Sequence, residues 1–327
     1  MTSNILSDLG VQLSTINSLQ TQQQNLQQLN EELSSGVQYS DLTDYSPTQA
    51  SQLMNFNNGI TQRQGYLSAM NTVNANLSVM SNSLTGLQSV IQQAIQAVNA
   101  APTQAQAQST GTEQQIQGMM SNFSFYLNTQ SSPGDYVFNG SRNNTQPVIN
   151  DISTITGTGA PTETMPFTAV TSPNLPTYDT EYPATDANAY TQSSVAIDSS
   201  LTLTYGVSSD NPAFQQMALG LRWAYAATNA PDEATYQTDM TNARTLLTGA
   251  ETGVQALQSS VASSQATVTQ TQALQNQDIN DLTTQIDNIQ QVDISSVGVK
   301  LTLLQTQLQA SYSATAKLTQ LSILNYL

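Results

Sequence analysis

The chain has 327 residues, enough for about two domains, and its 22 acidic and 6 basic side chains give a net charge of −16. The basic residues are scattered singly, whereas a phosphate backbone or an anionic membrane surface requires clustered Lys and Arg. We therefore expect neither nucleic-acid binding nor binding to an anionic membrane surface. Cysteine and histidine are absent, which excludes disulfide bonds, thiolate and imidazole metal ligands, and the Ser–His–Asp and Cys–His catalytic sites.

Charged residues make up only 9% of the chain, against roughly a quarter in typical proteins, and amides and hydroxyls supply most of the polarity. Such a surface is easier to understand if much of it is buried against other subunits, because amides cost less to desolvate than ions. No apolar run reaches the roughly 18 residues of a transmembrane helix, so we expect no membrane insertion. The N-terminus also lacks the basic segment and continuous apolar core of a cleavable signal peptide, so we expect no export by that route.

Residues 1–35 predict one long helix that Gly36 ends in a left-handed conformation. Residues 37–47 predict an irregular connector. In the helix predicted over residues 1–35, apolar residues recur at three- and four-residue intervals along one face. They are first Leu6, Leu9, Leu13 and Ile16, and then Leu26, Leu29 and Leu33.

The helical period returns in residues 48–101, where Pro102 marks the end, and again in residues 112–127. Tyr136-Val137-Phe138 predicts a short strand before an Asn139-Gly140 turn. Residues 141–209 are rich in Pro, Thr, Ser and Tyr, and alternation from Leu201 to Tyr205 predicts a strand. We interpret this block as a small β-rich insertion.

Helices resume at Asn211-Pro212, a cap followed by proline at the first helical position, and again after Pro231, where carboxylates suit a helix N-terminus. The second of these helices continues to about residue 291, and Asp293 is expected to cap the last one. That last helix has an apolar face at Leu301, Leu304, Leu308, Leu318, Leu321 and Leu324. Apolar faces at both chain ends predict that the terminal helices pair with each other, with copies of themselves, or both.

The order of elements predicts a mostly α fold, an elongated rod of long helices with paired N- and C-terminal coiled helices and a small β-rich insertion domain. A helix of about 50 residues spans about 75 Å, more than a compact domain of this size needs. We expect a terminal assembly domain (residues 1–44 and 290–327), a helical rod domain (45–140 and 210–289) and an outward insertion domain (141–209).

Four stretches of the sequence resemble those of a known family. Leu33-Ser34-Ser35-Gly36, the Asp44 to Pro47 segment, Tyr136-Val137-Phe138-Asn139-Gly140 and the closing residues 318–327 are similar to the corresponding parts of the bacterial flagellin superfamily. Within it the chain resembles the hook-associated protein 3 family, which forms the hook–filament junction. The resemblance implies a flagellin-like rod without cofactors.

The same resemblance implies a structural protein of the bacterial flagellum, an adaptor that assembles as a homo-oligomeric ring or tube. Its partners would be a hook-associated protein on the hook side, flagellin on the filament side and an export chaperone. It would be extracellular, exported through the flagellar type III apparatus without a cleavable signal. We expect the assembly interface at Leu6, Leu9, Leu13, Ile16, Leu301, Leu304, Leu308, Leu318, Leu321 and Leu324.

Several alternatives stay open. The terminal seam could be entirely intramolecular, and the protein could be a filament-forming flagellin or, in another class, a secreted helical adhesin or translocator-like protein. Catalysis is not expected. Asp41 and Asp44 are carboxylates of the kind that form a catalytic acid–base pair, but such residues are more typical of helix caps. Lys300 and Lys317 are more typical of the edge of a helix seam than of catalytic bases. An aromatic pair such as Tyr136 and Phe138 is more typical of hairpin packing than of a ligand site.

Overall fold

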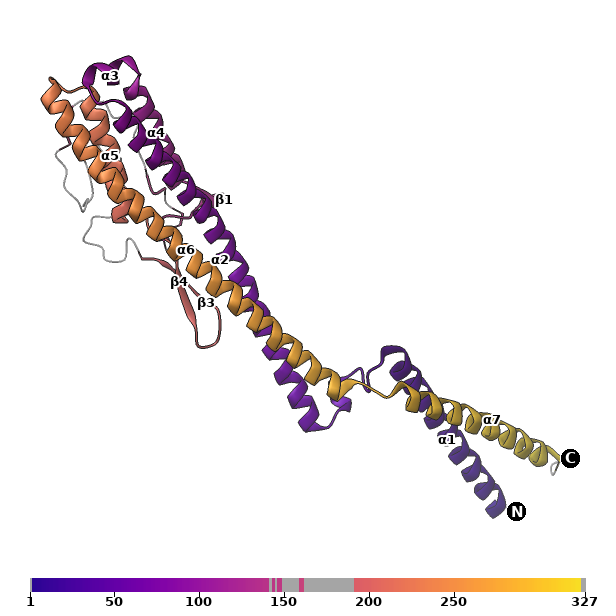
Figure 1. Cartoon of the computed structure of the whole chain (residues 1–327). Coiled ribbons are helices and arrows are strands. Elements are labelled where there is room, and N and C mark those ends of the chain that lie inside the picture. The colour runs from indigo at the N-terminus through magenta and orange to yellow at the C-terminus, as the bar shows by residue number, and fades with distance from the viewer. Residues whose placement is uncertain (1, 141–142, 145, 149–158, 162–190, 325–327) are drawn as a thin grey trace. The chain divides into compact units, whose positions relative to one another are not determined.

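The computed structural model describes residues 2–140, 143–144, 146–148, 159–161 and 191–324 (Figure 1). The described chain is mostly helical with two small sheets, which confirms the predicted fold class. It divides into two compact units. We call the first, which consists of Met1–Gln62 and Gln277–Leu327, the terminal unit, and the second, Arg63–Asn276, the central unit. Among the described residues, no helix has the length and hydropathy that crossing a bilayer would require.

The terminal unit contains α1 (Thr2–Ser35), the short 3₁₀ helix η1 (Leu42–Asp44) and α7 (Ile294–Leu324). Gly36 ends α1 with a φ of 73°, the left-handed conformation that glycine adopts without a steric penalty. The carboxylate of Asp293 caps α7 by accepting hydrogen bonds from the backbone N–H groups of Ser295 at 2.9 Å and Ser296 at 3.3 Å. Both predicted boundaries are therefore confirmed.

Backbone hydrogen bonds join the residues that follow α1 to the last residue of α6 (Glu233–Gln290) and to the residues that precede α7. The Gln38 N–H donates to the Gln290 carbonyl at 2.7 Å, and the Val292 N–H donates to the Gly36 carbonyl at 3.1 Å. Val37 and Gln291 form an isolated antiparallel bridge between these two bonds. Because one helix ends where the other begins, α1 and α7 run antiparallel side by side (Figure 1).

The central unit is built on long stretches of α2 (Pro47–Ala100) and α6 (Glu233–Gln290), with α4 (Thr112–Leu127) and α5 (Pro212–Thr228) packed against them. The side chain of Asn211 caps α5 by accepting from the Ala213 N–H at 3.0 Å, and Asp232 accepts from the Thr235 N–H at 2.8 Å. The short helix α3 (Gln104–Ser109), capped by Thr103, was not predicted. Its six residues are too few to show a hydrophobic period.

Close helix packing in the central unit depends on glycines. A Cβ on Gly253 of α6 would lie 2.6 Å from the Cβ of Ala213 in α5, and one on Gly220 of α5 would lie 2.9 Å from the Cγ of Leu247 in α6. Neither position has room for a side chain. The fully buried core around these contacts includes Leu84, Leu87, Ile91, Phe123, Phe214, Leu221, Tyr236 and Leu247.

Two antiparallel hairpins complete the central unit. β1 (Gln130–Ser132) pairs with β2 (Asp135–Tyr136), and β3 (Ser193–Ala196) pairs with β4 (Thr202–Tyr205). The strand predicted between Leu201 and Tyr205 is confirmed in β4. Much of the predicted 141–209 insertion lies outside the described residues.

The strand predicted over residues 136–138 is wrong in its extent. β2 contains Asp135 and Tyr136 and pairs across a turn in which Gly134 has a φ of 86°. Phe138 leaves the sheet, is fully buried, and packs edge-on against Phe214 with ring centroids 5.6 Å apart. Burial of this ring in the helical core outweighs continuation of a two-stranded ladder.

Candidate functional site

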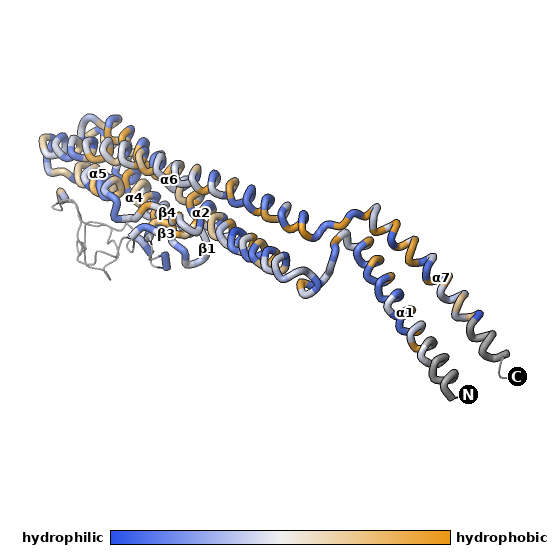
Figure 2. Tube along the Cα trace, turned by 90° about the horizontal axis from the view of Figure 1, so that it is seen from below, coloured by the Kyte–Doolittle hydropathy of each residue, from blue (hydrophilic) through white to orange (hydrophobic). Residues whose placement is uncertain are grey.

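The two terminal helices meet through residues at heptad spacing. On α7 the less exposed positions are Val297, Leu301, Leu304, Leu308, Ser311 and Thr315, and on α1 they are Thr15, Leu19, Gln22, Leu26 and Leu29. Because α1 is the element packed along α7 in the described chain, these positions form the seam between them. Figure 2 shows that α1 is mainly hydrophilic and that α7 contributes more hydrophobic residues.

Three of the predicted interface residues of α7 belong to this seam. Leu308 is only 6% exposed, and Leu301 and Leu304 are half-buried. They therefore pack on α1 of the same chain. Leu318, Leu321 and Leu324 continue the helical backbone of α7, but their side chains lie outside the described residues.

The predicted interface residues of α1 that the structure describes lie off the seam. Leu13 is 54% exposed and Ile16 is 55% exposed, whereas Leu19 and Leu26 are partly buried against α7. Leu6 and Leu9 have helical backbones in α1, with side chains outside the described residues.

Two seam residues of α1, Leu26 and Leu29, belong to the apolar stripe predicted from the sequence, whereas Leu19 was missed although its spacing fits. Leu19 stands seven residues before Leu26, and Leu29 follows three later, which is a heptad pattern. The seam position between Leu19 and Leu26 is occupied by Gln22. This glutamine hides the heptad pattern, because the surrounding stretch is rich in side-chain amides.

A second face of α7 remains exposed. Val299 is 70% exposed and Leu303 is 58% exposed, and Ser295, Thr302 and Thr306 extend the same face at helical spacing. At about 100° per residue this outer face lies opposite Val297 and Leu304 of the seam. This face is hard to recognise in the sequence because the leucines of the seam dominate the apolar pattern.

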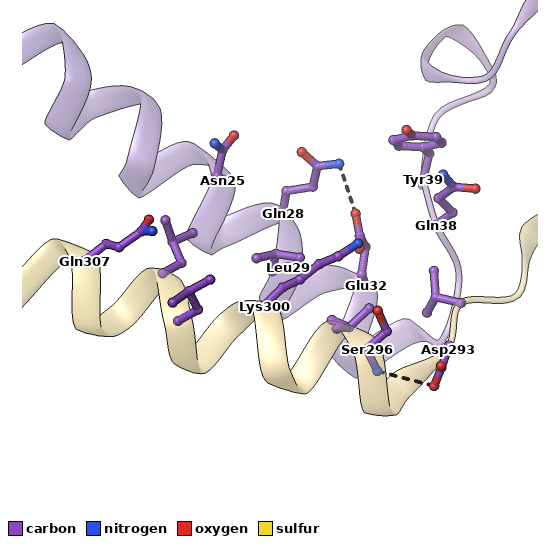
Figure 3. Close-up of a pocket in the computed structure, with 14 residues that line it drawn as sticks. Asn25, Gln28, Leu29, Glu32, Gln38, Tyr39, Asp293, Ser296, Lys300 and Gln307 are labelled. Atoms are coloured by element: carbon purple, nitrogen blue, oxygen red, sulfur yellow. Dashed lines mark hydrogen bonds between the residues drawn. The ribbon is translucent and has the colours of Figure 1, made fainter.

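A groove of about 470 Å³ lies beside the seam, where α1, the connector and α7 meet (Figure 3). Gln28 of α1 donates a hydrogen bond to the Glu32 carboxylate at 3.0 Å, and Lys300 of α7 extends across the groove toward Glu32. Amides of Asn25 and Gln307 line the same groove. The groove therefore presents an ammonium, a carboxylate and side-chain amides as hydrogen-bonding groups.

The acidic residues of the connector are explained by local structure. Asp41 caps η1: its carboxylate accepts from the Thr43 N–H and from the Thr43 hydroxyl, both at 2.9 Å. These hydrogen bonds, the backbone one first, lower the pKa of Asp41, so the group is ionised at neutral pH and unsuited to act as an acid. Within the described chain, no cluster of acidic side chains has the arrangement of a metal site.

The motif residues 33–47 form the exit from α1. The hydroxyls of Ser34 and Ser35 donate to the Glu31 carbonyl at 3.1 and 2.7 Å and so close the last turn, after which Gly36 reverses the backbone. Leu33, at the end of α1, is 37% exposed. Asp44 ends η1, and Pro47 is the first residue of α2.

The second motif, Tyr136 to Gly140, holds together the two ends of the 141–209 segment. The Phe138 carbonyl accepts from the Ser209 N–H at 2.7 Å, and the Ser193 hydroxyl donates to the Gly140 carbonyl at 3.0 Å. Gly140 has a φ of 57°, and a Cβ there would collide with the carbonyl oxygen of Thr191. Val137 packs on the core and Tyr136 is half-buried, so the motif is structural.

The chain is thus a protein of long helices in which the N-terminal helix α1 pairs with the C-terminal helix α7. Residues 244–327 match the family described as the bacterial flagellin C-terminal helical region, and this match spans much of α6 and all of α7. No curated protein matched the chain.

The fold is similar to the solved structure of a provisionally assigned flagellar hook-associated protein from Vibrio parahaemolyticus. The TM-score is 0.51 at 13% sequence identity, and the alignment covers 76% of this chain and 100% of that one. At this identity the similarity shows the fold alone. Together with the family match, it supports placement in the flagellin superfamily.

Proposed function

We propose that this protein is a structural subunit of the bacterial flagellum and acts as the adaptor at the hook–filament junction. The observation that carries the proposal is the α1–α7 pair: α7 lies in the region that matches the flagellin C-terminal helical region, and it pairs with α1 while a second apolar face stays exposed. The similarity in fold to a hook-associated protein supports the junction role. A structural role also fits a chain for which we propose no catalysis and no cofactor.

In this proposal the chain has three parts. The terminal helices, residues 1–44 and 290–327, assemble the protein into a homo-oligomeric ring or tube. Residues 45–140 and 210–289 form the rod, and residues 141–209 project outward. Outer-face residues such as Leu13 and Leu303, which are more than half exposed in the single chain, become buried in the assembly, and this burial offsets the entropy lost on association.

The neighbours of such an adaptor would be a hook-associated protein on the hook side and flagellin on the filament side. An export chaperone would cover the terminal helices before assembly. The protein would reach the outside of the cell through the flagellar export apparatus, without a cleavable signal peptide.

A filament-forming flagellin is the second candidate. The specific observation in its favour is that the matching family model describes the C-terminal region of flagellin itself. Both candidates use the same terminal helices, so the distinction depends on where the protein is found along the flagellum.

Immunogold electron microscopy of intact cells tests the two candidates, with an antibody against residues 141–209. We expect label in a narrow band between hook and filament. Label along the whole filament would identify a flagellin, and label away from the flagellum would refute both. A strain that lacks the gene controls for antibody specificity.

Removal of Leu324 to Leu327 tests the role of the chain end. We expect the truncated protein to be exported to the medium and to remain unassembled, because its terminal helix loses part of the assembly surface. Normal filaments in a strain that carries only the truncated protein would contradict the proposal.

A further inference from the structure

A second groove, of about 470 Å³, lies between α2 and α4 in the central unit. In Figure 1, α4 returns along the last part of α2 after the short helix α3. Most of the groove wall consists of five side-chain amides, those of Gln93, Gln96, Gln114, Gln115 and Asn122. None of the described residues that line the groove is charged, so the lining attracts neither an anion nor a cation.

The amides of this groove retain hydrogen-bonding groups for a ligand. The side chains of Gln96, Gln114 and Asn122 form no hydrogen bond with another described residue. Gln93 donates one N–H to the Ser89 hydroxyl at 3.1 Å and keeps a second N–H and its oxygen. The wall therefore offers both donors and acceptors.

The floor of the groove consists of small or buried apolar residues. Ala97 and Met119 are buried, and Ala100 and Gly118 complete the floor. A Cβ on Gly118 would have nothing within 4 Å, so the groove is open above this residue. Protein partners gain most of their binding energy from large side chains that fill pockets. This floor offers little apolar contact for such a side chain.

The aromatic ring of Phe125 extends the same side of α4. Phe125 follows Asn122 by three residues, so the two side chains are neighbours on one face of the helix. Its ring is 69% exposed, the highest value among the large apolar side chains described in the central unit. The ring of Tyr126 supports it edge-on, with centroids 5.4 Å apart, and itself fills the space that a Cβ on Gly86 would need.

We propose that the groove between α2 and α4 binds a neutral oligosaccharide. Sugar hydroxyls both donate and accept hydrogen bonds and so match a wall of side-chain amides. The C–H groups on one face of a sugar ring can pack on the exposed ring of Phe125, because the face of an aromatic ring carries partial negative charge. An anionic polymer would need Arg or Lys in the groove instead. The site lies within one unit of a single chain, so it does not rest on the proposed flagellar role.

Saturation-transfer NMR with the full-length protein tests this site. The neutral probes are tetra-N-acetylchitotetraose and maltotetraose, and a heparin tetrasaccharide is the anionic probe. We expect transfer to at least one neutral probe and only background transfer to the heparin fragment. Absence of transfer to both neutral probes, or transfer to heparin as strong as to the neutral probes, would overturn the proposal.

Two variants locate the bound sugar. Phe125→Ala removes the aromatic ring, and Gly118→Leu fills the open floor with a residue that favours the helix. In titrations of the neutral probe, each should lower the affinity at least ~10-fold. Circular dichroism checks that both variants remain helical.

Matched control variants lie elsewhere in the central unit. Leu274→Ala removes an apolar side chain of α6 that is 55% exposed, and Gly65→Leu adds a leucine at a helical glycine with nothing within 4 Å. Both should bind the neutral probe as the natural protein does. If Phe125→Ala and Gly118→Leu bind the probe as well as these controls, the sugar lies outside the groove and the proposal is wrong.

A second copy of the chain is the alternative occupant of the groove. Sedimentation velocity of the natural protein and of Gly118→Leu distinguishes the two. If Gly118→Leu reduces self-association and leaves sugar binding unchanged, the groove is a contact between copies and the proposal fails. Immunogold labelling gives an independent result, so failure of either proposal leaves the other intact.

Discussion

The side-chain amide of Gln23 in α1 donates a hydrogen bond of 2.8 Å to the hydroxyl of Tyr312 in α7, a residue 289 positions later in the chain. With the backbone hydrogen bonds of Gly36 and Gln38 to Val292 and Gln290, it gives the pair two points of attachment. The position of α1 along α7 is therefore fixed at both places. An exposed hydrogen bond contributes only about 1 kcal/mol, so most of the stability of the pair must come from the apolar seam.

Leu308→Ala should destabilise the α1–α7 pair by about 2 kcal/mol, the lower end of the cost of removing a buried leucine side chain, because a two-helix seam can partly collapse. Hydrogen exchange of α1 and α7 amides should be faster in this variant. Leu303→Ala is the matched control: this leucine is 58% exposed, and we expect a change below about 0.5 kcal/mol. Equal effects of the two substitutions would show that Leu308 is not in the seam.

Gly253→Ala should destabilise the central unit by about 1–3 kcal/mol, the usual cost of overpacking. The added methyl group would lie 2.6 Å from the Cβ of Ala213, so α5 and α6 would have to separate. Gly65→Ala in α2 has nothing within 4 Å and should instead stabilise its helix by up to about 1 kcal/mol. Urea unfolding of both variants measures the difference, and stabilisation by Gly253→Ala would contradict the close contact.

Asn128→Ala should loosen the residues that follow the Tyr136 to Gly140 motif. The Asn128 side chain donates to the Val148 carbonyl and accepts from the Val148 N–H, both at 2.9 Å, and Val148 is 1% exposed. Loss of this partner leaves buried polar groups and should cost about 1–3 kcal/mol. Faster hydrogen exchange at the Val148 amide checks the prediction.

The control for this prediction is Asn122→Ala, an exposed position in α4, the helix that Asn128 follows. It should leave exchange at Val148 unchanged. If the Val148 amide exchanges at the same rate in both alanine variants, the Asn128 side chain does not hold the segment around Val148.

Tyr236 should make the central unit sensitive to alkaline pH. Burial, and secondarily the negative charge of Glu233, raises the pKa of the Tyr236 hydroxyl to about 12, whereas a tyrosine of the unfolded chain ionises near 10. The folded state therefore holds its proton more tightly, and stability is lost as the pH rises from about 10 to about 12. Below pH 10 this contribution does not vary.

Tyr236→Phe separates this effect from others. The variant loses a hydrogen bond to the Ala101 carbonyl and should be less stable at neutral pH, but its stability should fall less steeply between pH 10 and 12. Urea unfolding at intervals across this range measures the slope. A slope equal to that of the natural protein would show that ionisation of Tyr236 is not linked to unfolding.

Helix boundaries were largely predictable from the sequence, because the residues that start or end a helix act on the backbone directly next to them. Gly36 ends α1, Asn211 with Pro212 starts α5, and Asp293 starts α7. The strand near Tyr136 was only partly predictable, because the burial of Phe138 against Phe214 depends on a helix that begins more than 70 positions later.

Caps, helix breakers and the spacing of leucines are enough to predict that both terminal segments are helices with apolar faces. Which of these faces meet depends on packing in the folded chain. Leu13 and Ile16 have helical spacing as good as that of Leu19 and Leu26, and spacing cannot rank two stripes on one helix. The attachment at residues 36–38 and 290–292 sets the position of α1 along α7, and the helices pack with Leu19 and Leu26 turned toward α7 and Leu13 and Ile16 outward.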